Sequence, residues 1–144
     1  MSLRAKRGPE SVSLLLWDGG RVLLVRRGRG GLFPSTWTLA GRELARGEPP
    51  EAAALSATEE LVGVETSHIR LLCSLSQPSP FRDERGPDSL FQVITWEGEP
   101  PVSETLRWFT LEELGSIRIF REARDTLRAV CATLPATQTA EVVR

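Results

Sequence analysis

Arginine and glutamate side chains gather around one glycine-rich stretch of this sequence. Arg26 and Arg27 end a run of Val and Leu, Arg42 follows a short segment that begins with Trp, and Glu48 and Glu60 come soon afterwards. The planar donor fork of arginine suits phosphate oxygens, and carboxylate oxygens are the ligands that Mg²⁺ prefers in proteins. These residue types in this order predict a site for a phosphorylated molecule.

The arginines have a second explanation in the composition of the chain. Seventeen of the 18 cationic side chains are arginine, so arginines on solvated surfaces are expected throughout the sequence. Strand geometry limits how many of these arginines can contact a ligand, because successive side chains point to opposite faces of a sheet. Only one of Arg26 and Arg27 is therefore expected to face a ligand bound on the sheet.

The elements that must position these residues are mostly strands. Residues 11–17 and 21–27 are both rich in Val and Leu and are separated by Asp18-Gly19-Gly20, which predicts a β-hairpin because Gly adopts positive φ without steric cost. Residues 37–39 are predicted to form a short strand between glycine-rich loops. Further along the chain we predict strands over 69–75, 90–96 and 106–109 and one helical turn over 111–114.

Two helices complete the predicted elements. The first opens at Pro49-Pro50-Glu51, with proline and an acid in its first turn, and ends at Gly63, which are matched start and stop signals. Three- and four-residue spacing predicts that its buried face holds Ala54, Leu55, Thr58, Leu61 and Val62. The second helix covers residues 118–134, and its predicted buried face holds Phe120, Ala123, Leu127, Val130 and Leu134.

Length, charge and hydropathy limit the classes of protein to which the chain can belong. It has 144 residues and a formal net charge of −1, and a nucleic-acid binder normally carries a basic excess. No apolar run approaches the roughly 18 residues that a membrane span needs. We predict one cytoplasmic domain of the α+β class over residues 11–134, between a flexible arm over 1–10 and a frayed tail over 135–144.

Several short motifs resemble those of the Nudix (MutT-like) hydrolase family, in order and spacing, over about residues 11–134. They are paired arginines at the end of a strand, Trp-x-Leu-x-Gly at 37–41, Gly-Glu-x-Pro-Glu-x-Ala at 47–53 and Trp-Phe-x-x-Glu-Glu-Leu at 108–114. The resemblance implies an α/β/α sandwich, hydrolysis of a nucleoside diphosphate linked to another group, and Mg²⁺ or Mn²⁺ as cofactor. Members of the family often form homodimers, which is the assembly it implies here.

The motif of the family, G-x5-E-x7-R-E-U-x-E-E-x-G-U with U bulky and aliphatic, fits this chain only in part. Aligned without gaps, it is matched by Glu48, Glu60 and the closing Gly63-Val64. The residues that depart from it are Arg42 at the first glycine, Ser56, Ala57 and Thr58 at R-E-U, and Leu61 at the second paired glutamate. Of the three helix carboxylates that the family uses to bind metal, only Glu60 is retained.

The resemblance also implies roles for individual residues. The predicted catalytic residues are Glu60 and Glu48, and the predicted metal ligands are these two together with Glu104, which lies just before the late strand. The predicted ligand-binding residues are Arg26, Arg27, Arg42 and Trp37. For the acids the alternative is a solvated surface carboxylate, and for Trp37 it is a place in the core.

Two functions follow from a motif that is retained in part. The first is a divergent hydrolase in which a reduced metal site activates water. The second is a binding module of the same fold that recognises a nucleotide, protein or RNA partner without hydrolysis. Both functions are compatible with a nucleotide-like phosphorylated small molecule as ligand, and neither involves a membrane or bulk nucleic acid.

Overall fold

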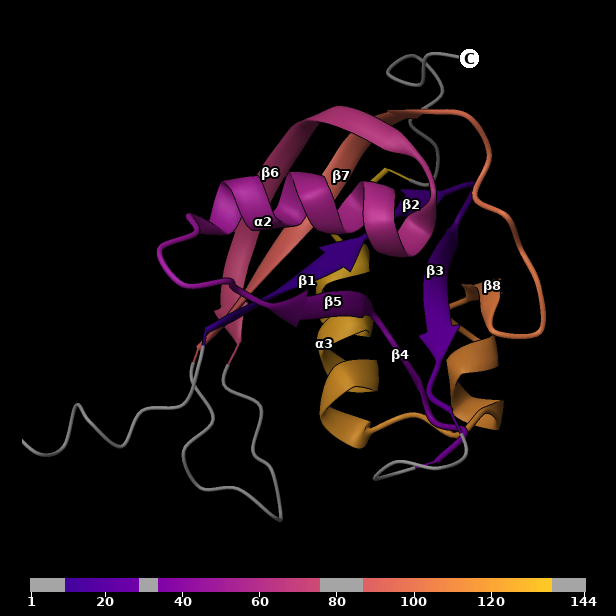
Figure 1. Ribbon diagram of the computed structural model, residues 1–144. Helices are drawn as coiled ribbons and strands as arrows, with labels where there is room; N and C mark the ends of the chain where they lie inside the picture. The colour runs from indigo at the N-terminus through magenta and orange to yellow at the C-terminus, as the bar shows by residue number, and fades with distance from the viewer. Residues whose placement is uncertain (1–9, 29–33, 76–86, 136–144) are drawn as a thin grey trace, which may run out of the picture.

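The computed structural model describes residues 10–28, 34–75 and 87–135 and has the expected mixture of strands and helices (Figure 1). The α+β class is confirmed, whereas the boundaries predicted for the domain, the arm and the tail stay predictions, because residues 1–9 and 136–144 lie outside the described ranges. The elements are β1 (Ser11–Leu15), β2 (Trp17–Asp18), β3 (Arg21–Arg26), β4 (Trp37–Thr38), β5 (Ala40–Glu43), α2 (Pro50–Ala57), the π-helical turn η1 (Thr58–Val62), β6 (Glu65–Leu75), β7 (Asp88–Glu97), β8 (Leu106–Thr110), the 3-10 turn η2 (Glu113–Ser116) and α3 (Arg121–Cys131).

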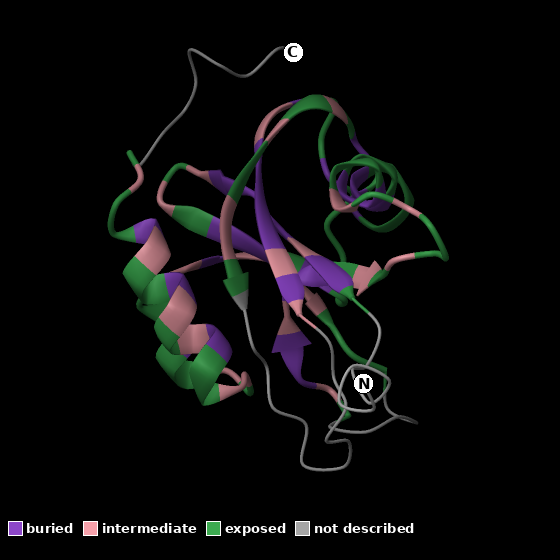
Figure 2. Cartoon of the chain, turned by 90° about the vertical axis from the view of Figure 1, so that its left-hand side faces the viewer, coloured by how far each residue is buried: buried purple, intermediate pink, exposed green. Residues whose placement is uncertain are grey.

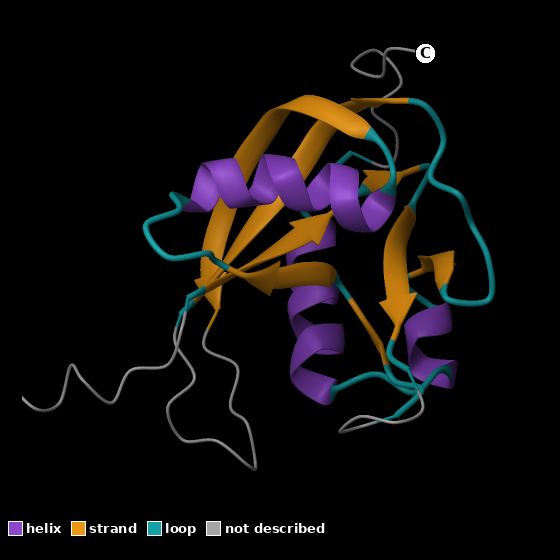
Figure 3. Ribbon diagram, viewed as in Figure 1, coloured by secondary structure: helices purple, strands orange, loops and turns teal. Residues whose placement is uncertain are grey.

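The strands form two sheets. The first has the order β5-β1-β7-β6, with β1 parallel to β7 and antiparallel to β5. The second joins β2, β3 and β4, and β8 also pairs with β3. Figure 3 shows α2 and α3 in purple on opposite sides of the first sheet, and the turned view of Figure 2 shows the same layers edge-on. The architecture is therefore the expected α/β/α sandwich, in which β5 is an edge strand.

The predicted hairpin is correct only at its tip. Gly19 and Gly20 have φ angles of 62° and 77°, and β2 pairs with β3 across them. The preceding strand β1 leaves the hairpin and lies between β5 and β7 in the first sheet. A strand in that position is buried on both faces, which accounts for its nearly continuous apolar sequence.

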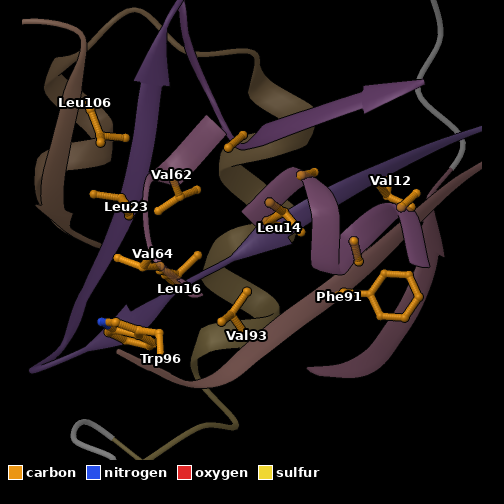
Figure 4. Packing of buried hydrophobic residues seen from close by; sticks show 14 residues of the cluster. Val12, Leu14, Leu16, Leu23, Val62, Val64, Phe91, Val93, Trp96 and Leu106 are labelled. Atoms are coloured by element: carbon orange, nitrogen blue, oxygen red, sulfur yellow. The ribbon is translucent and has the colours of Figure 1, made fainter. Parts of the chain in front are cut away.

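Alternate side chains of the first sheet enter two separate cores. Val12 and Leu14 of β1 and Val93 of β7 face α2, in the cluster drawn in Figure 4. Leu15 and Leu90 lie in the other cluster, with Leu127 of α3. This alternation matters for the site, because neighbouring residues of β1 and β5 also face different helices.

The helix α2 packs through alanine, and its predicted buried face is only partly correct. The buried residues of this segment are Ala53, Ala54, Ala57, Thr58 and Val62. Leu55 and Leu61, which were expected on that face, are 37% and 40% exposed. The small side chains let α2 lie close to the sheet, and the last turn is π-helical, with a hydrogen bond from Gly63 N–H to Thr58 O. A π turn adds a residue, so later side chains depart from the 3.6-residue period.

The other predicted elements are present with different ends. The strands β6 and β7 are longer than predicted and pair with three irregularities of register. The helical turn expected over 111–114 is a 3-10 turn that begins at Glu113, and α3 begins at Arg121 rather than at residue 118. Within the described ranges, no helix is long and apolar enough to span a membrane.

Candidate functional site

The Arg42 guanidinium binds both glutamates that match the sequence motif. Its Nη1 and Nη2 donate to Oε1 and Oε2 of Glu48 at 2.9 and 3.0 Å, which makes this pair bidentate. Its Nε donates to Oε1 of Glu60 at 3.2 Å, and Nη1 also donates to the Glu43 carbonyl oxygen at 3.0 Å. Bidentate pairs of this kind are the strong, geometrically specific form of the ion pair. Arg42, Glu48 and Glu60 are termed the arginine–carboxylate cluster below.

Three elements bring the cluster together. Arg42 lies opposite Val12 in the β5–β1 register, so its side chain points to the α2 face of the sheet. Glu48 lies just before α2, and Glu60 lies in the π turn that ends it. The approach of β5 to β1 requires glycine at position 41, because a Cβ there would clash with the Val12 carbonyl oxygen.

The two carboxylates of the cluster differ in environment. The Glu48 side chain is 18% exposed and also accepts the Ala45 N–H at 2.8 Å. The hydrogen bonds from Arg42 and then from Ala45 lower the pKa of Glu48 to about 2, and the bond to Glu48 raises the pKa of Arg42. The Glu60 side chain is 55% exposed, so water screens its single contact with Arg42.

The remainder of the helix does not supply the missing metal ligands. Ala57 is fully buried in the core against the sheet, and Leu61 is apolar. Within residues 10–28, 34–75 and 87–135, no three His, Cys, Asp or Glu side chains are grouped so that they could hold a metal ion. Glu104 therefore does not join Glu48 and Glu60 in one ligand set. As arranged, these residues do not fit Mg²⁺ or Mn²⁺, and their metal-binding roles stay predictions.

A pocket opens on the other face of the first sheet, beside α3. Its floor is formed by Asp88, which is 4% exposed, and by the serines next to it. Ser11 Oγ donates to Asp88 Oδ1 at 2.6 Å, and Ser13 Oγ donates to Oδ2 at 2.7 Å. An ionised carboxylate has about four acceptor positions, so Asp88 keeps acceptor capacity after binding both serines. This cavity, termed the Asp88 pocket, has a volume of about 180 Å³.

The edge strand β5 separates the Asp88 pocket from the arginine–carboxylate cluster. Gly41 and Glu43 pair with Ser13 and Ser11, so they face the same side as the pocket floor. Arg42 lies between them and borders the pocket, while its guanidinium binds carboxylates on the opposite face. A ligand could therefore occupy the pocket and reach the cluster by crossing one strand.

Of the four predicted ligand-binding residues, two line the pocket, Trp37 lies in the core and Arg26 is exposed beside it. Arg27 and Arg42 line the Asp88 pocket, whereas the Arg26 guanidinium lies over Trp37, 5.9 Å from the ring centroid. Trp37 is 6% exposed and packs edge-on against Phe109 at 4.9 Å. The ligand-stacking role of Trp37 stays a prediction, and its burial favours the alternative, a place in the core.

Sequence reasoning missed the pocket floor. Ser11, Ser13 and Asp88 carry no motif, and Asp88 comes 75 residues or more after the serines that bind it. The available signal was two serines at a spacing of two in an otherwise apolar strand. Such a spacing places both hydroxyls on one face and calls for a polar partner there.

Residues 8–130 match the family model of the NUDIX domain. The chain belongs to the Nudix family. This membership agrees with the motifs at 37–41, 47–53 and 108–114. At a coarse level, it supports hydrolysis of a nucleoside diphosphate linked to another group, and Nudix hydrolases generally use divalent metal ions. No curated protein is significantly similar to this Nudix chain in sequence.

Solved structures with the same Nudix fold include hydrolases and a ligand-bound domain. The MutT NUDIX hydrolase from Burkholderia pseudomallei superposes with a TM-score of 0.75 at 25% identity, covering 86% of this chain and 98% of that one. The NUDIX domain of Shewanella oneidensis NrtR, complexed with ADP ribose, has a TM-score of 0.71 at 17% identity and covers 89% of each chain. The C. elegans Ap4A hydrolase has a TM-score of 0.66 at 17% identity, covering 89% of this chain and 99% of that one.

Proposed function

We propose that this Nudix protein recognises a nucleoside diphosphate linked to another group and hydrolyses it slowly. The observation that carries the proposal is the Asp88 pocket, which lies one strand away from the two glutamates retained from the motif. One ring of the ligand would occupy the pocket, and its phosphates would extend from Arg27 at the pocket wall across the edge strand β5 towards Glu60.

The floor of the Asp88 pocket suits ligand groups that donate hydrogen bonds. Among the residues that the structure describes, Asp88 is held by the neutral hydroxyls of Ser11 and Ser13, so its remaining acceptor positions suit donor groups of a ligand. Ribose hydroxyls and the amino group of a base are donors of this kind. A cavity of about 180 Å³ is below the size range of typical pockets for a whole small molecule. It therefore suits one ring of a longer ligand.

The names of two structural neighbours guide the choice of ligands. One is complexed with ADP ribose, and another is an Ap4A hydrolase. Both compounds have phosphates joined to ribose and a base, as the proposed ligand class requires. Their identities to this chain are low, so they supply probes for the experiment and do not identify the substrate.

Slow hydrolysis follows from the residues of the motif. Ala57 and Leu61 carry no carboxylate, and Glu48 is engaged by Arg42 through both oxygens. Glu60 is the more exposed of the two retained glutamates, so we assign to it the acceptance of a proton from the attacking water. Loss of metal ligands and a base removes several kcal/mol of transition-state stabilisation, about a thousandfold or more in rate.

The arginine–carboxylate cluster favours a second candidate, a module that binds the same ligand without hydrolysis. Arg42 uses four of its five N–H donors within the protein. A cluster so fully occupied by its own contacts is a stable arrangement without substrate or metal. In this second candidate, Glu60 contributes only to that arrangement.

The test combines binding and turnover on one panel of compounds. ADP-ribose, Ap4A, nucleotide sugars and nucleoside triphosphates are each added to the protein with Mg²⁺, with Mn²⁺ and with EDTA. The proposal predicts a rise in unfolding temperature that depends on ligand concentration, together with slow product release that Glu60→Gln abolishes. Binding without turnover would establish the second candidate, and absence of binding by every compound would overturn both.

A pair of variants locates the ligand. Asp88→Asn keeps the size of the floor residue and removes its charge, so binding should weaken about tenfold, as expected for a lost charge-assisted hydrogen bond. Asp125→Asn is the matched control, because Asp125 lies on α3 with its side chain 61% exposed and paired with Arg124. Equal affinity of the two variants would place the ligand outside the Asp88 pocket.

A further inference from the structure

We propose that the Arg42 guanidinium takes the place of a divalent metal at Glu48 and Glu60, so that this chain binds its phosphorylated ligand without a metal ion. The part that concerns the ligand rests on the proposed function. The part that concerns the metal stands on the cluster alone.

The site engages Arg42 through four of its five N–H donors. Two of its N–H groups bind both oxygens of Glu48, a third binds Glu60 and a fourth binds the Glu43 carbonyl oxygen. A divalent ion that used the same carboxylate oxygens would have to displace a fixed positive charge about 3 Å away. Like charges at that separation repel strongly even near a protein surface, so Arg42 disfavours a divalent ion at these carboxylate oxygens.

If Arg42 takes the place of a divalent metal, the departures of this chain from the motif have a common explanation. The arginine of the motif is replaced by Ser56, and an arginine stands instead at position 42, where the motif has glycine. In this chain the positive charge therefore stands on strand β5 instead of on the helix, and from there it reaches both retained glutamates. Ala57 and Leu61 lack the acids that a divalent ion would need in addition.

The experiment uses Mn²⁺ alone as the probe, because free Mn²⁺ is quantified directly by electron paramagnetic resonance. The wild-type protein should show no saturable binding up to the millimolar range. Arg42→Gly restores the residue of the motif and frees both carboxylates, so its affinity for Mn²⁺ should rise at least tenfold over wild type. Glu48→Gln added to Arg42→Gly should remove that gain.

Control variants test whether the gain in Mn²⁺ affinity comes from removing the Arg42 guanidinium. Arg42→Gln is measured in parallel in case glycine in β5 destabilises the fold, and circular dichroism confirms that each variant is folded. Arg46→Gln removes an exposed arginine of the same segment and should leave Mn²⁺ binding as in wild type. Saturable Mn²⁺ binding by wild type, or no gain in either Arg42 variant, would overturn the proposal.

A second arm tests the part of the proposal that concerns the ligand. The increase in unfolding temperature produced by a bound compound, such as ADP-ribose, should be the same with EDTA as with Mn²⁺. Loss of that increase in EDTA would show that the ligand requires a metal ion and would overturn the inference. If no compound binds in any condition, the proposed function fails, while the Mn²⁺ titration still decides whether Arg42 replaces the metal.

Discussion

The two faces of strand β5 carry carboxylates that are held in different ways. On the α2 face, Glu48 is bound by the Arg42 guanidinium through both of its oxygens. On the α3 face, Asp88 is more deeply buried, and within the described ranges its partners are the hydroxyls of Ser11 and Ser13. A carboxylate paired with a cation is neutralised in place, whereas one held by neutral donors keeps its charge for an incoming group. The difference supports the proposal that the α3 face recognises the ligand, while the charges of the α2 face are paired with one another.

The largest effect on stability is expected from restoring a glutamate of the motif at a buried position on the α2 face. Ala57 is fully buried among the apolar residues between α2 and the sheet. Ala57→Glu would bury a charge without a partner, so we expect the free energy of unfolding to fall by about 3–5 kcal/mol. Chemical denaturation monitored by circular dichroism measures the change.

Leu61→Glu is the matched control for this prediction. It restores the other missing glutamate of the motif, at a position that is 40% exposed, and should change the free energy of unfolding by no more than about 0.5 kcal/mol. A similar loss for both variants would mean that the two positions are equally buried and that Ala57 does not face the sheet alone.

Much of the fold was predictable because local signals specify it. Pro50 and Gly63 mark the limits of the first helical segment, and the motifs implied the sandwich. The exposure of Leu55 was not predictable, because it depends on how closely three alanines bring α2 to the sheet. The π turn that ends the segment is likewise set by tertiary contacts.

The candidate site was predictable to the extent that it follows sequence motifs. Glu48, Glu60 and the nearby arginines were identified, but their pairing was not, because it depends on the side of β5 to which Arg42 points. Asp88 had no local signal, since the serines that bind it come from a strand far away in sequence. Such contacts are fixed by strand register in the folded sheet.

The second prediction disrupts the α3 face. Asp88→Ala would leave the buried Ser11 hydroxyl without its acceptor, and an unsatisfied buried donor costs about 1–3 kcal/mol. The free energy of unfolding should fall by that amount in chemical denaturation. Ser11→Ala in the Asp88→Ala background should recover part of the loss, because it removes the orphaned hydroxyl. No coupling between the two substitutions would show that the pair does not interact.

The third prediction compares two neighbouring arginines. Arg27 lines the Asp88 pocket and Arg26 lies over Trp37, so Arg27→Ala should weaken ligand binding about tenfold through a lost charged contact. Arg26→Ala should leave ligand affinity unchanged and lower stability by no more than about 1 kcal/mol, the size of an exposed cation–π contact. Isothermal titration with a compound identified by the panel measures both affinities. A larger loss of affinity for Arg26→Ala than for Arg27→Ala would mean that Arg26, and not Arg27, faces the ligand.

The smallest effect is expected in the free energy of unfolding at acidic pH, and it depends on Glu48 on the α2 face. Arg42 lowers the pKa of Glu48 to about 2 from an ordinary value of 4.5, so the unfolded chain binds a proton at this residue before the folded chain does. The stabilisation by Glu48 is thus complete above pH 4.5 and is lost as the pH falls towards 2. Near pH 3, unfolding of wild type should take up about one proton more than unfolding of Glu48→Gln, seen as a steeper decrease in the free energy of unfolding with falling pH. Glu59→Gln, in the same turn as Glu60 but not bonded to Arg42, should keep the wild-type slope, and equal slopes for wild type and Glu48→Gln would show that Arg42 does not hold Glu48 ionised in solution.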